Sequence, residues 1–339
     1  MRITRRRVNR LVAGSAAIAA TPWAGAQSDW ERVVDAARKE GKVVLYTANV
    51  GVKFHHDIAA AFQKRFGIPV EILEARASEL RERIRTEQAA GRAIGDVSHN
   101  GATTTALQHK DGTFQPHGSL PGLAGLLPQF KSDGTRVPLF AIVYGMLVNT
   151  RLVPAGTEPR SWKDLLDPRW KGRILADDLR ALGGGSVLFF VTHDAFGRGY
   201  HEQLAQQGLT FTRDIREAER RVARGEAAIW IPFTFANYPQ IRGLPVKPVV
   251  PTEGGTYVMY EIAVLRNAPH PNAARLLMNF FVEREAQGIY ANGGYVPVTQ
   301  GVALSAPADI RELIEVKLLG TTDAARQNDM LKAAQEIYK

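Results

Sequence analysis

Polar side chains suited to holding a small ligand follow several apolar runs of this 339-residue chain. Early in the chain they lie beside the apolar runs 43–46, 69–73 and 96–99, and later beside the Gly-rich stretch 183–186 and the run 227–231. Hydroxyl, amide, phenol and guanidinium groups hold a ligand by hydrogen bonds, without covalent chemistry. The candidate ligand-binding residues are Thr47, Asn49, Arg76, Ser78, Asn100, Tyr144, Arg180, Gly184, Gly185, Ser186, Thr234, Asn237, Tyr238, Tyr260 and Glu261.

An anion is the ligand that these residue types favour. Gly184, Gly185 and Ser186 introduce a predicted helix, and the free N–H groups and dipole of a helix N-terminus attract negative charge. Arg76 and Arg180, if they point inward, can each hold a carboxylate or phosphonate by two parallel hydrogen bonds. The alternatives are solvated surface charges for the arginines and a flexible turn for the glycines.

Signatures of catalysis are absent from the sequence. The chain has no cysteine, which excludes disulfides, thiolate nucleophiles and Cys-ligated metal sites. No phosphate-cradling loop, nucleophile elbow or His-x-x-x-His zinc pair occurs. Asp177 and Asp178 are the best candidate acid–base pair, but neighbours on a strand point to opposite faces. We therefore expect a binding protein without a cofactor; an exported enzyme on the same scaffold is the alternative.

The elements that position these residues form two α/β units. In the first unit, apolar runs of strand length alternate with segments of helical periodicity, which predicts a doubly wound sheet with ligands at the carboxyl ends of its strands. A second unit, in which strand and helix segments also alternate, begins near Pro138. The predicted strands are 43–46, 69–73, 96–99, 140–147, 173–176, 227–231 and 257–265. The predicted helices are 29–40, 57–66, 79–90, 187–191, 214–224 and 272–285.

One long motif carries a family resemblance. Residues 159–172 read Pro-x-Ser-Trp-x-Asp-Leu-Leu-Asp-Pro-x-Trp-Lys-Gly, Tyr144-Gly145 and Asn149-Thr150 precede them, and Gly-Tyr-Val-Pro follows at 294–297. This pattern resembles family 1 bacterial extracellular solute-binding proteins, in the branch with ferric-, thiamine- and phosphonate-binding members. The motif is specific for the family and not for the ligand.

The resemblance implies a two-lobe α/β fold of the type II periplasmic binding proteins, with a doubly wound mixed sheet in each lobe. The chain would cross between the lobes near Pro138–Tyr144 and Gly254–Ala263. Lobe one would comprise residues 27–138 and 263–305, lobe two residues 139–262, and helices within 306–339 would pack on the lobes. A ligand in the cleft would favour closure, and the closed monomer would dock on the permease of an ABC transporter at the inner membrane.

Ferric iron is the alternative ligand. The resemblance implies that an iron-binding relative uses an adjacent tyrosine pair from lobe two, often with a histidine and a glutamate from lobe one. The corresponding stretch here, 233–238, reads Phe-Thr-Phe-Ala-Asn-Tyr and has no such pair. His55 and His56 are adjacent and cannot face one site from a helix. We therefore expect a small organic anion, such as a carboxylate or phosphonate.

The N-terminal residues 1–26 read as an export signal. A basic stretch, 4–10, precedes the apolar run 11–20, and Ala-Gly-Ala at 24–26 offers a cleavage site. Paired arginines favour the twin-arginine route, although Val8-Asn9 departs from its usual Phe-Leu, so Sec export stays open. Without the five arginines of this segment the formal net charge falls from +9 to +4, which does not indicate a nucleic-acid partner. We expect a periplasmic protein.

Overall fold

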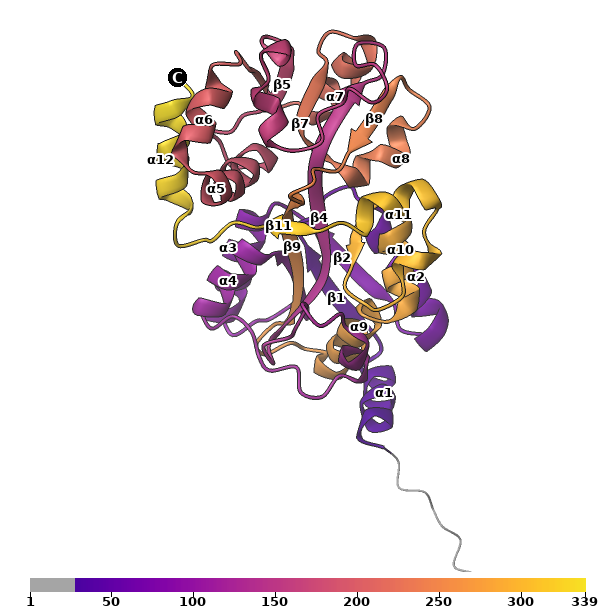
Figure 1. Cartoon of the computed structure of the whole chain (residues 1–339). Coiled ribbons are helices and arrows are strands. Elements are labelled where there is room, and N and C mark those ends of the chain that lie inside the picture. Colours follow the sequence, from indigo (N-terminus) through magenta and orange to yellow (C-terminus); the bar gives the residue numbers. More distant parts are fainter. Residues whose placement is uncertain (1–27) are drawn as a thin grey trace, which may run out of the picture.

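Two lobes joined by two long strands make up the protein (Figure 1). The computed structural model describes residues 28–339, so the predicted export signal lies outside the described residues. The long strands are β4 (Arg136–Asn149) and β9 (Gly255–Val264), which pair antiparallel along most of their length. Figure 1 shows β4 running from one lobe into the other and β9 beginning between the lobes, where the chain returns from lobe two.

Lobe one follows the predicted alternation of strands and helices. Its parallel strands have the order β2-β1-β3, and β3 pairs antiparallel with β9. The strands are β1 (Val43–Thr47), β2 (Val70–Glu74), β3 (Val97–Gly101) and the short β10 (Val296–Pro297) on β4. The helices are α1 (Asp29–Glu40), α2 (Lys53–Phe66), α3 (Ala77–Ala89), α4 (Ala102–Lys110), α9 (Pro271–Phe281), α10 (Arg284–Asn292) and α11 (Ala308–Ile314).

Lobe two continues the same sheet on the other side of β4. Its order is β4-β7-β5-β6, in which β7, β5 and β6 are parallel, and β8 pairs with the end of β4. The strands are β5 (Ile174–Asp177), β6 (Thr210–Thr212), β7 (Ile229–Thr234) and β8 (Val246–Val249). The helices are α5 (Gly184–Phe196), α6 (Arg198–Ala205), α7 (Ile215–Arg224), α8 (Tyr238–Ile241) and α12 (Gln327–Ile337).

Local sequence signals account for several helix boundaries. Ser28 caps α1 in a capping box with Glu31, and Gly41 ends the helix in the left-handed conformation. Other boundaries differ from prediction. The predicted helix 272–285 is two helices, because Glu283 adopts an extended backbone conformation between them. The predicted strand 96–99 stops before Asn100, but hydrogen bonding to β9 extends β3 to residue 101.

The motif at 159–172 anchors the start of β9. It forms two short 3₁₀ turns, Lys163–Leu166 and Pro168–Trp170. The fully buried Trp162 donates a hydrogen bond from Nε1 to the carbonyl oxygen of Gly254, 3.0 Å away, immediately before β9. The hydroxyl of Tyr200 donates to the carbonyl oxygen of Trp162 at 2.8 Å. The indole thus links lobe two to β9. We call β4 and β9, the two long strands between the lobes, the hinge strands.

A third passage between the lobes was not predicted. The segment from α11 to α12 runs along the hinge, where β11 (Leu318–Gly320) pairs parallel with β9 (Figure 1). Helix α12 then packs on α5 and α6 of lobe two. Arg326 forms an ion pair with Asp194 at 2.7 Å, and the hydroxyl of Tyr338 is hydrogen-bonded to Nδ1 of His201 at 2.8 Å.

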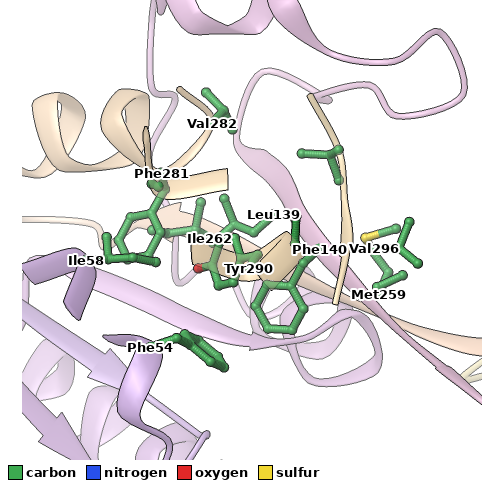
Figure 2. Close-up of a cluster of buried hydrophobic side chains, with 14 of the residues drawn as sticks. Phe54, Ile58, Leu139, Phe140, Met259, Ile262, Phe281, Val282, Tyr290 and Val296 are labelled. Atoms are coloured by element: carbon green, nitrogen blue, oxygen red, sulfur yellow. The ribbon is translucent and has the colours of Figure 1, made fainter. Parts of the chain in front are cut away.

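Apolar packing fixes the base of both hinge strands in lobe one. Figure 2 shows Phe54 and Ile58 of α2 meeting Phe140 of β4, Ile262 of β9 and Tyr290 of α10. The rings of Phe140 and Tyr290 lie 4.5 Å apart between centroids. Such close packing resists deformation, so the hinge strands start from a rigid base. None of the helices within residues 28–339 combines the length and apolar character that crossing a membrane requires.

Candidate ligand site between the lobes

Two tyrosines share one face of the hinge strands. Tyr144 lies opposite Thr256, and Tyr260 lies opposite Phe140, in the antiparallel register of β4 and β9. Opposed residues point to the same face and side chains alternate along each strand, so both phenols lie on one side of the sheet. Burial raises the pKa of Tyr144, and the Tyr260 phenol adds to that rise. Burial also raises the pKa of Tyr260.

Asp177 lies beside Tyr144 at the end of β5. Its Oδ2 accepts a hydrogen bond from the backbone N–H of Gly185 at 2.7 Å, and its Oδ1 accepts one from the N–H of Asp178 at 3.0 Å. A Cβ atom on Gly184 would lie 3.4 Å from Oδ2 of Asp177 and 3.2 Å from Cε1 of Tyr144. Burial raises the pKa of Asp177, although the two backbone N–H groups act in the opposite direction. Its carboxylate also raises the pKa of Tyr144.

Tyr295 adds a third phenol at the same place. It follows α10 and packs against Phe140, with 5.1 Å between ring centroids. Burial, reinforced by the Tyr260 phenol, raises the pKa of Tyr295 to about 12. The preceding Gly294 touches lobe two, because a Cβ there would lie 2.9 Å from Cα of Ala236. The hinge face therefore gathers three phenols and one carboxylate, which we call the phenol cluster: Tyr144, Asp177, Tyr260 and Tyr295.

Beneath Tyr260, three buried polar groups bond to one another in lobe one. Oγ1 of Thr47 lies 2.9 Å from Nδ1 of His99 and 3.3 Å from Nε2 of His55, and the two ring nitrogens lie 3.1 Å apart. All three residues are fully buried. Burial lowers the pKa of His55 to about 3 and holds that of His99 well below its usual value. Thr47 is thus engaged by both histidines inside lobe one, and the rings of His99 and Tyr260 lie 5.6 Å apart between centroids.

The predicted anion site on α5 is filled by the protein itself. The Asp177 carboxylate takes the N–H of Gly185 at the helix start, and the hydroxyl of Ser186 donates to the carbonyl of Gly183 at 2.9 Å. Arg180 is directed away from the cluster, because it pairs with Asp178 at 2.8 Å and donates to the carbonyl of Tyr338 at 3.2 Å. The expected grip of Arg180 on an anion is therefore not supported.

Other predicted residues are spread over the fold. Arg76 and Ser78 are exposed at the start of α3, and Asn49 is buried with its N–H directed to Thr47. Asn100 donates to the hydroxyl of Ser98 at 3.0 Å inside lobe one. These four positions are not joined to the phenol cluster by any contact that we observe among residues 28–339. Sequence order alone could not show that β3 continues past Asn100.

In the second half of the chain, only some predicted residues approach the cluster. Thr234 pairs with Tyr144 in the sheet. Asn237 donates to Glu219 at 2.7 Å, and Tyr238 lines a separate cavity beside α11. Glu261 points to the face opposite Tyr260, where it contacts the hydroxyl of Thr105 and Arg136.

The structure adds Asp177 and Tyr295 to the residues that the sequence suggested. Asp177 ends an apolar strand just before a glycine run, and Tyr295 belongs to the Gly-Tyr-Val-Pro stretch of the family motif. Both signals are visible in the sequence. Only the fold places the two residues beside Tyr144 and Tyr260.

Phenol and carboxylate oxygens at one point suit a hard cation better than an anion. The described residues contain no group of three or more His, Asp or Glu side chains that could hold a metal ion. A metal bound at the hinge face would therefore need phenolate ligands. A cavity of about 590 Å³ lies on the opposite face of β9, beside Tyr257, Met259 and Glu261, and does not include the phenol cluster.

Comparisons with known proteins agree with this fold. A family model described as bacterial extracellular solute-binding protein matches residues 108–320, more than half of the chain. Iron uptake protein A1 of Synechocystis sp. is 25% identical over 301 residues, and the match covers 82% of each protein.

Two solved structures have the same fold at lower identity, and each covers 88% of this chain. IdiA (FutA) of Trichodesmium, in complex with iron and citrate, has a TM-score of 0.73 at 20% identity and is covered over its full length. Ferric iron-binding protein A of Mannheimia haemolytica, in an open conformation, has a TM-score of 0.73 at 17% identity and is covered over 98%. The two-lobe fold and the resemblance carried by the 159–172 motif are thus confirmed, and the chain belongs to the bacterial extracellular solute-binding protein family.

Proposed function

We propose that this protein captures ferric iron between its lobes in the periplasm and delivers it to the permease of an ABC importer. The observation that carries the proposal is the position of Tyr144 and Tyr260 on one hinge face beside Asp177. Phenolate and carboxylate oxygens are hard donors that match a small, highly charged cation. The iron-related names of similar proteins support the same ligand.

The organic anion that the sequence favoured fits the site less well. An anion at this face would meet the carboxylate of Asp177, and Arg180 is turned toward the C-terminal helix. Two like charges at close range in a poorly solvated place cost free energy. A cation would instead compensate Asp177 and the developing phenolates.

The proposed coordination differs from an adjacent tyrosine pair. Residues 233–235 are Phe-Thr-Phe, so the phenolates come from β4, β9 and the segment after α10. An octahedral ion takes about six oxygen ligands. Three phenolates and one carboxylate leave positions for a small chelating anion, which would arrive with the metal. Citrate is such an anion and accompanies iron in the Trichodesmium structure.

Closure of the lobes would complete the site. We propose that bending of β4 near 138–144 and of β9 near 254–263 moves lobe two, with Asp177, against the Tyr295 segment of lobe one. A ligand that contacts both lobes stabilises the closed state, because only that state makes both sets of contacts. The predicted lobe limits, at residues 138 and 262, place Asp177 and Tyr295 on opposite lobes.

Titration of the metal-free protein with ferric citrate tests the proposal. Phenolate coordination to Fe(III) produces a charge-transfer absorption band in the visible range, and we expect one with a 1:1 endpoint. Tyr144→Phe and Tyr260→Phe should each weaken the band and the affinity. Tyr257→Phe is the matched control, because Tyr257 lies on the opposite face of the same strand. Absence of the band, or equal loss in Tyr257→Phe, would overturn the assignment.

A further inference from the structure

A second cavity lies at the back of the hinge. Its volume is about 590 Å³, which is within the range of small-molecule sites, roughly 300–1,000 Å³. The face of β9 that carries Tyr257 and Met259 forms one wall, the loop 129–131 a second, and residues 316–318 of the third passage a third. Because side chains alternate along β9, this cavity is separate from the phenol cluster around Tyr260.

The lining combines apolar surface with cations at the rim. Phe130, Met259 and Leu318 are buried or half-buried, whereas the lysines Lys131 and Lys317 are exposed. The hydroxyl of Tyr257 has no hydrogen-bond partner that we observe among residues 28–339. The surface therefore offers an apolar floor, one phenol and two ammonium groups.

The one acidic side chain of the lining already has partners. Glu261 accepts a hydrogen bond from the hydroxyl of Thr105 and lies 3.4 Å from Arg136. Burial raises the pKa of Glu261, while the hydrogen bond from Thr105 and the charge of Arg136 act in the opposite direction. Glu261 thus leaves Lys131 and Lys317 without a carboxylate partner inside the cavity.

The wall formed by the third passage is held in place. The N–H of Gly255 donates to the carbonyl oxygen of Lys317 at 2.9 Å. A Cβ on Gly254 would lie only 2.6 Å from the same oxygen. Only glycine at position 254 therefore allows the start of β9 and the segment at Lys317 to approach this closely. The cavity therefore has a defined shape on its β11 side.

We propose that this cavity is a binding site for a small apolar monocarboxylate, distinct from the metal site on the opposite face of β9. The apolar body of the ligand lies against Met259 and Leu318. Its carboxylate lies toward Lys131, Lys317 and the Tyr257 hydroxyl.

Methionine methyl NMR locates such binding directly. Of the five methionines, Met259 lines the cavity, Met146 and Met278 are buried elsewhere, and Met330 lines a different cavity. Phenylacetate is the probe, and phenylacetamide is its uncharged counterpart. We expect a saturable shift of the Met259 methyl signal with phenylacetate, unchanged Met146 and Met278 signals, and markedly weaker binding of the amide.

Charge-matched variants complete the test. Lys131→Gln combined with Lys317→Gln should weaken phenylacetate binding roughly tenfold, about 0.7 kcal/mol for each partly screened contact, and leave phenylacetamide binding unchanged. Lys39→Gln combined with Lys64→Gln removes the same charge from exposed positions of α1 and α2 and should change neither. The Tyr144→Phe protein should bind phenylacetate like the wild type, which separates this site from the iron proposal. An unmoved Met259 signal, or equal binding of acid and amide, overturns the inference.

Discussion

The carboxylate of Asp177 accepts a hydrogen bond from the backbone N–H of Gly185 at 2.7 Å, so a side chain of lobe two occupies the N-terminus of α5. A glycine-rich helix start would otherwise attract an anionic ligand. The same carboxylate lies beside the Tyr144 ring, at the face where the lobes meet. Asp177 therefore occupies the helix N-terminus at which the sequence predicted an anion, and the proposed cation site rests on the same carboxylate.

Replacing Asp177 tests both of its roles. Asp177→Asn keeps an oxygen for the Gly185 N–H but removes the charge, so we expect at least tenfold weaker ferric binding. The free energy of unfolding should fall by about 1 kcal/mol or less, the usual size of a helix N-terminal contact. Ferric titration and urea denaturation measure the two effects. Asp178→Asn is the control, because Asp178 pairs with Arg180 away from the cluster and should leave iron affinity unchanged.

Iron binding should release protons. Burial raises the pKa of Tyr144 and of Tyr260, so both phenols are protonated at neutral pH before the metal arrives. Each phenolate ligand that forms releases one proton, so affinity should rise with pH, by roughly tenfold per pH unit for each tyrosine that coordinates. Affinities measured between pH 6 and 8 against a fixed competitor, corrected for the protonation of that competitor, give the slope. A slope near zero would contradict phenolate coordination.

Acid should destabilise lobe one through its buried histidines. His55 has a folded-state pKa of about 3, below the unfolded value near 6.5, so its stabilising contribution is complete above pH 6.5 and declines as the pH falls toward 3. Between pH 7.5 and 5.5 the free energy of unfolding should fall by about 1.4 kcal/mol from His55 alone. Urea denaturation at both pH values measures the fall. It should shrink in His55→Gln but persist in His56→Gln, because His56 is exposed.

Comparing Trp162 with Trp170, which belong to the same motif, distinguishes the contribution of a hydrogen bond to stability from that of packing. Trp162 and Trp170 are both buried, but only Trp162 donates from Nε1, to the carbonyl of Gly254; no partner for Nε1 of Trp170 occurs among residues 28–339. Both Trp→Phe changes leave a similar void. Trp162→Phe should cost about 1 kcal/mol more in the free energy of unfolding, because the buried carbonyl of Gly254 loses its donor. Equal losses in denaturant titration would assign Trp162 to packing alone.

Individual strands and helices of lobe one could be predicted because their signals are local. The apolar run at 43–46, the helix cap at Ser28 and the glycine at 41 specify their elements without distant contacts. The motif at 159–172 carries the family resemblance, and the two-lobe fold is what that resemblance implies. The third passage escaped prediction because the three residues of β11 show no periodicity, and their strand exists only by pairing with β9.

The site was harder to predict because it depends on distant contacts. Arg180 has the right residue type and a place near a helix start, but its guanidinium pairs with Asp178 and also donates to the carbonyl of Tyr338, which is 158 residues away. Thr47 follows a strand as a ligand-binding residue would, yet two histidines from other elements bury it. Tyr144 and Tyr260 were identified from the hinge segments. Their meeting with Asp177 required the pairing of β4 with both β7 and β9.

The closing stretch of the chain gives this protein a particular order of assembly. Ala334 and Tyr338 belong to the apolar core of lobe two, and β9, α9 and α10 belong to that of lobe one. Lobe two therefore cannot complete its apolar core before residues 334–338 have been synthesised, although domains generally fold as units from the N-terminus during synthesis. Lobe one can thus pack before lobe two, and a nascent chain stalled before Ala334 would expose the unfinished core of lobe two to chaperones and proteases.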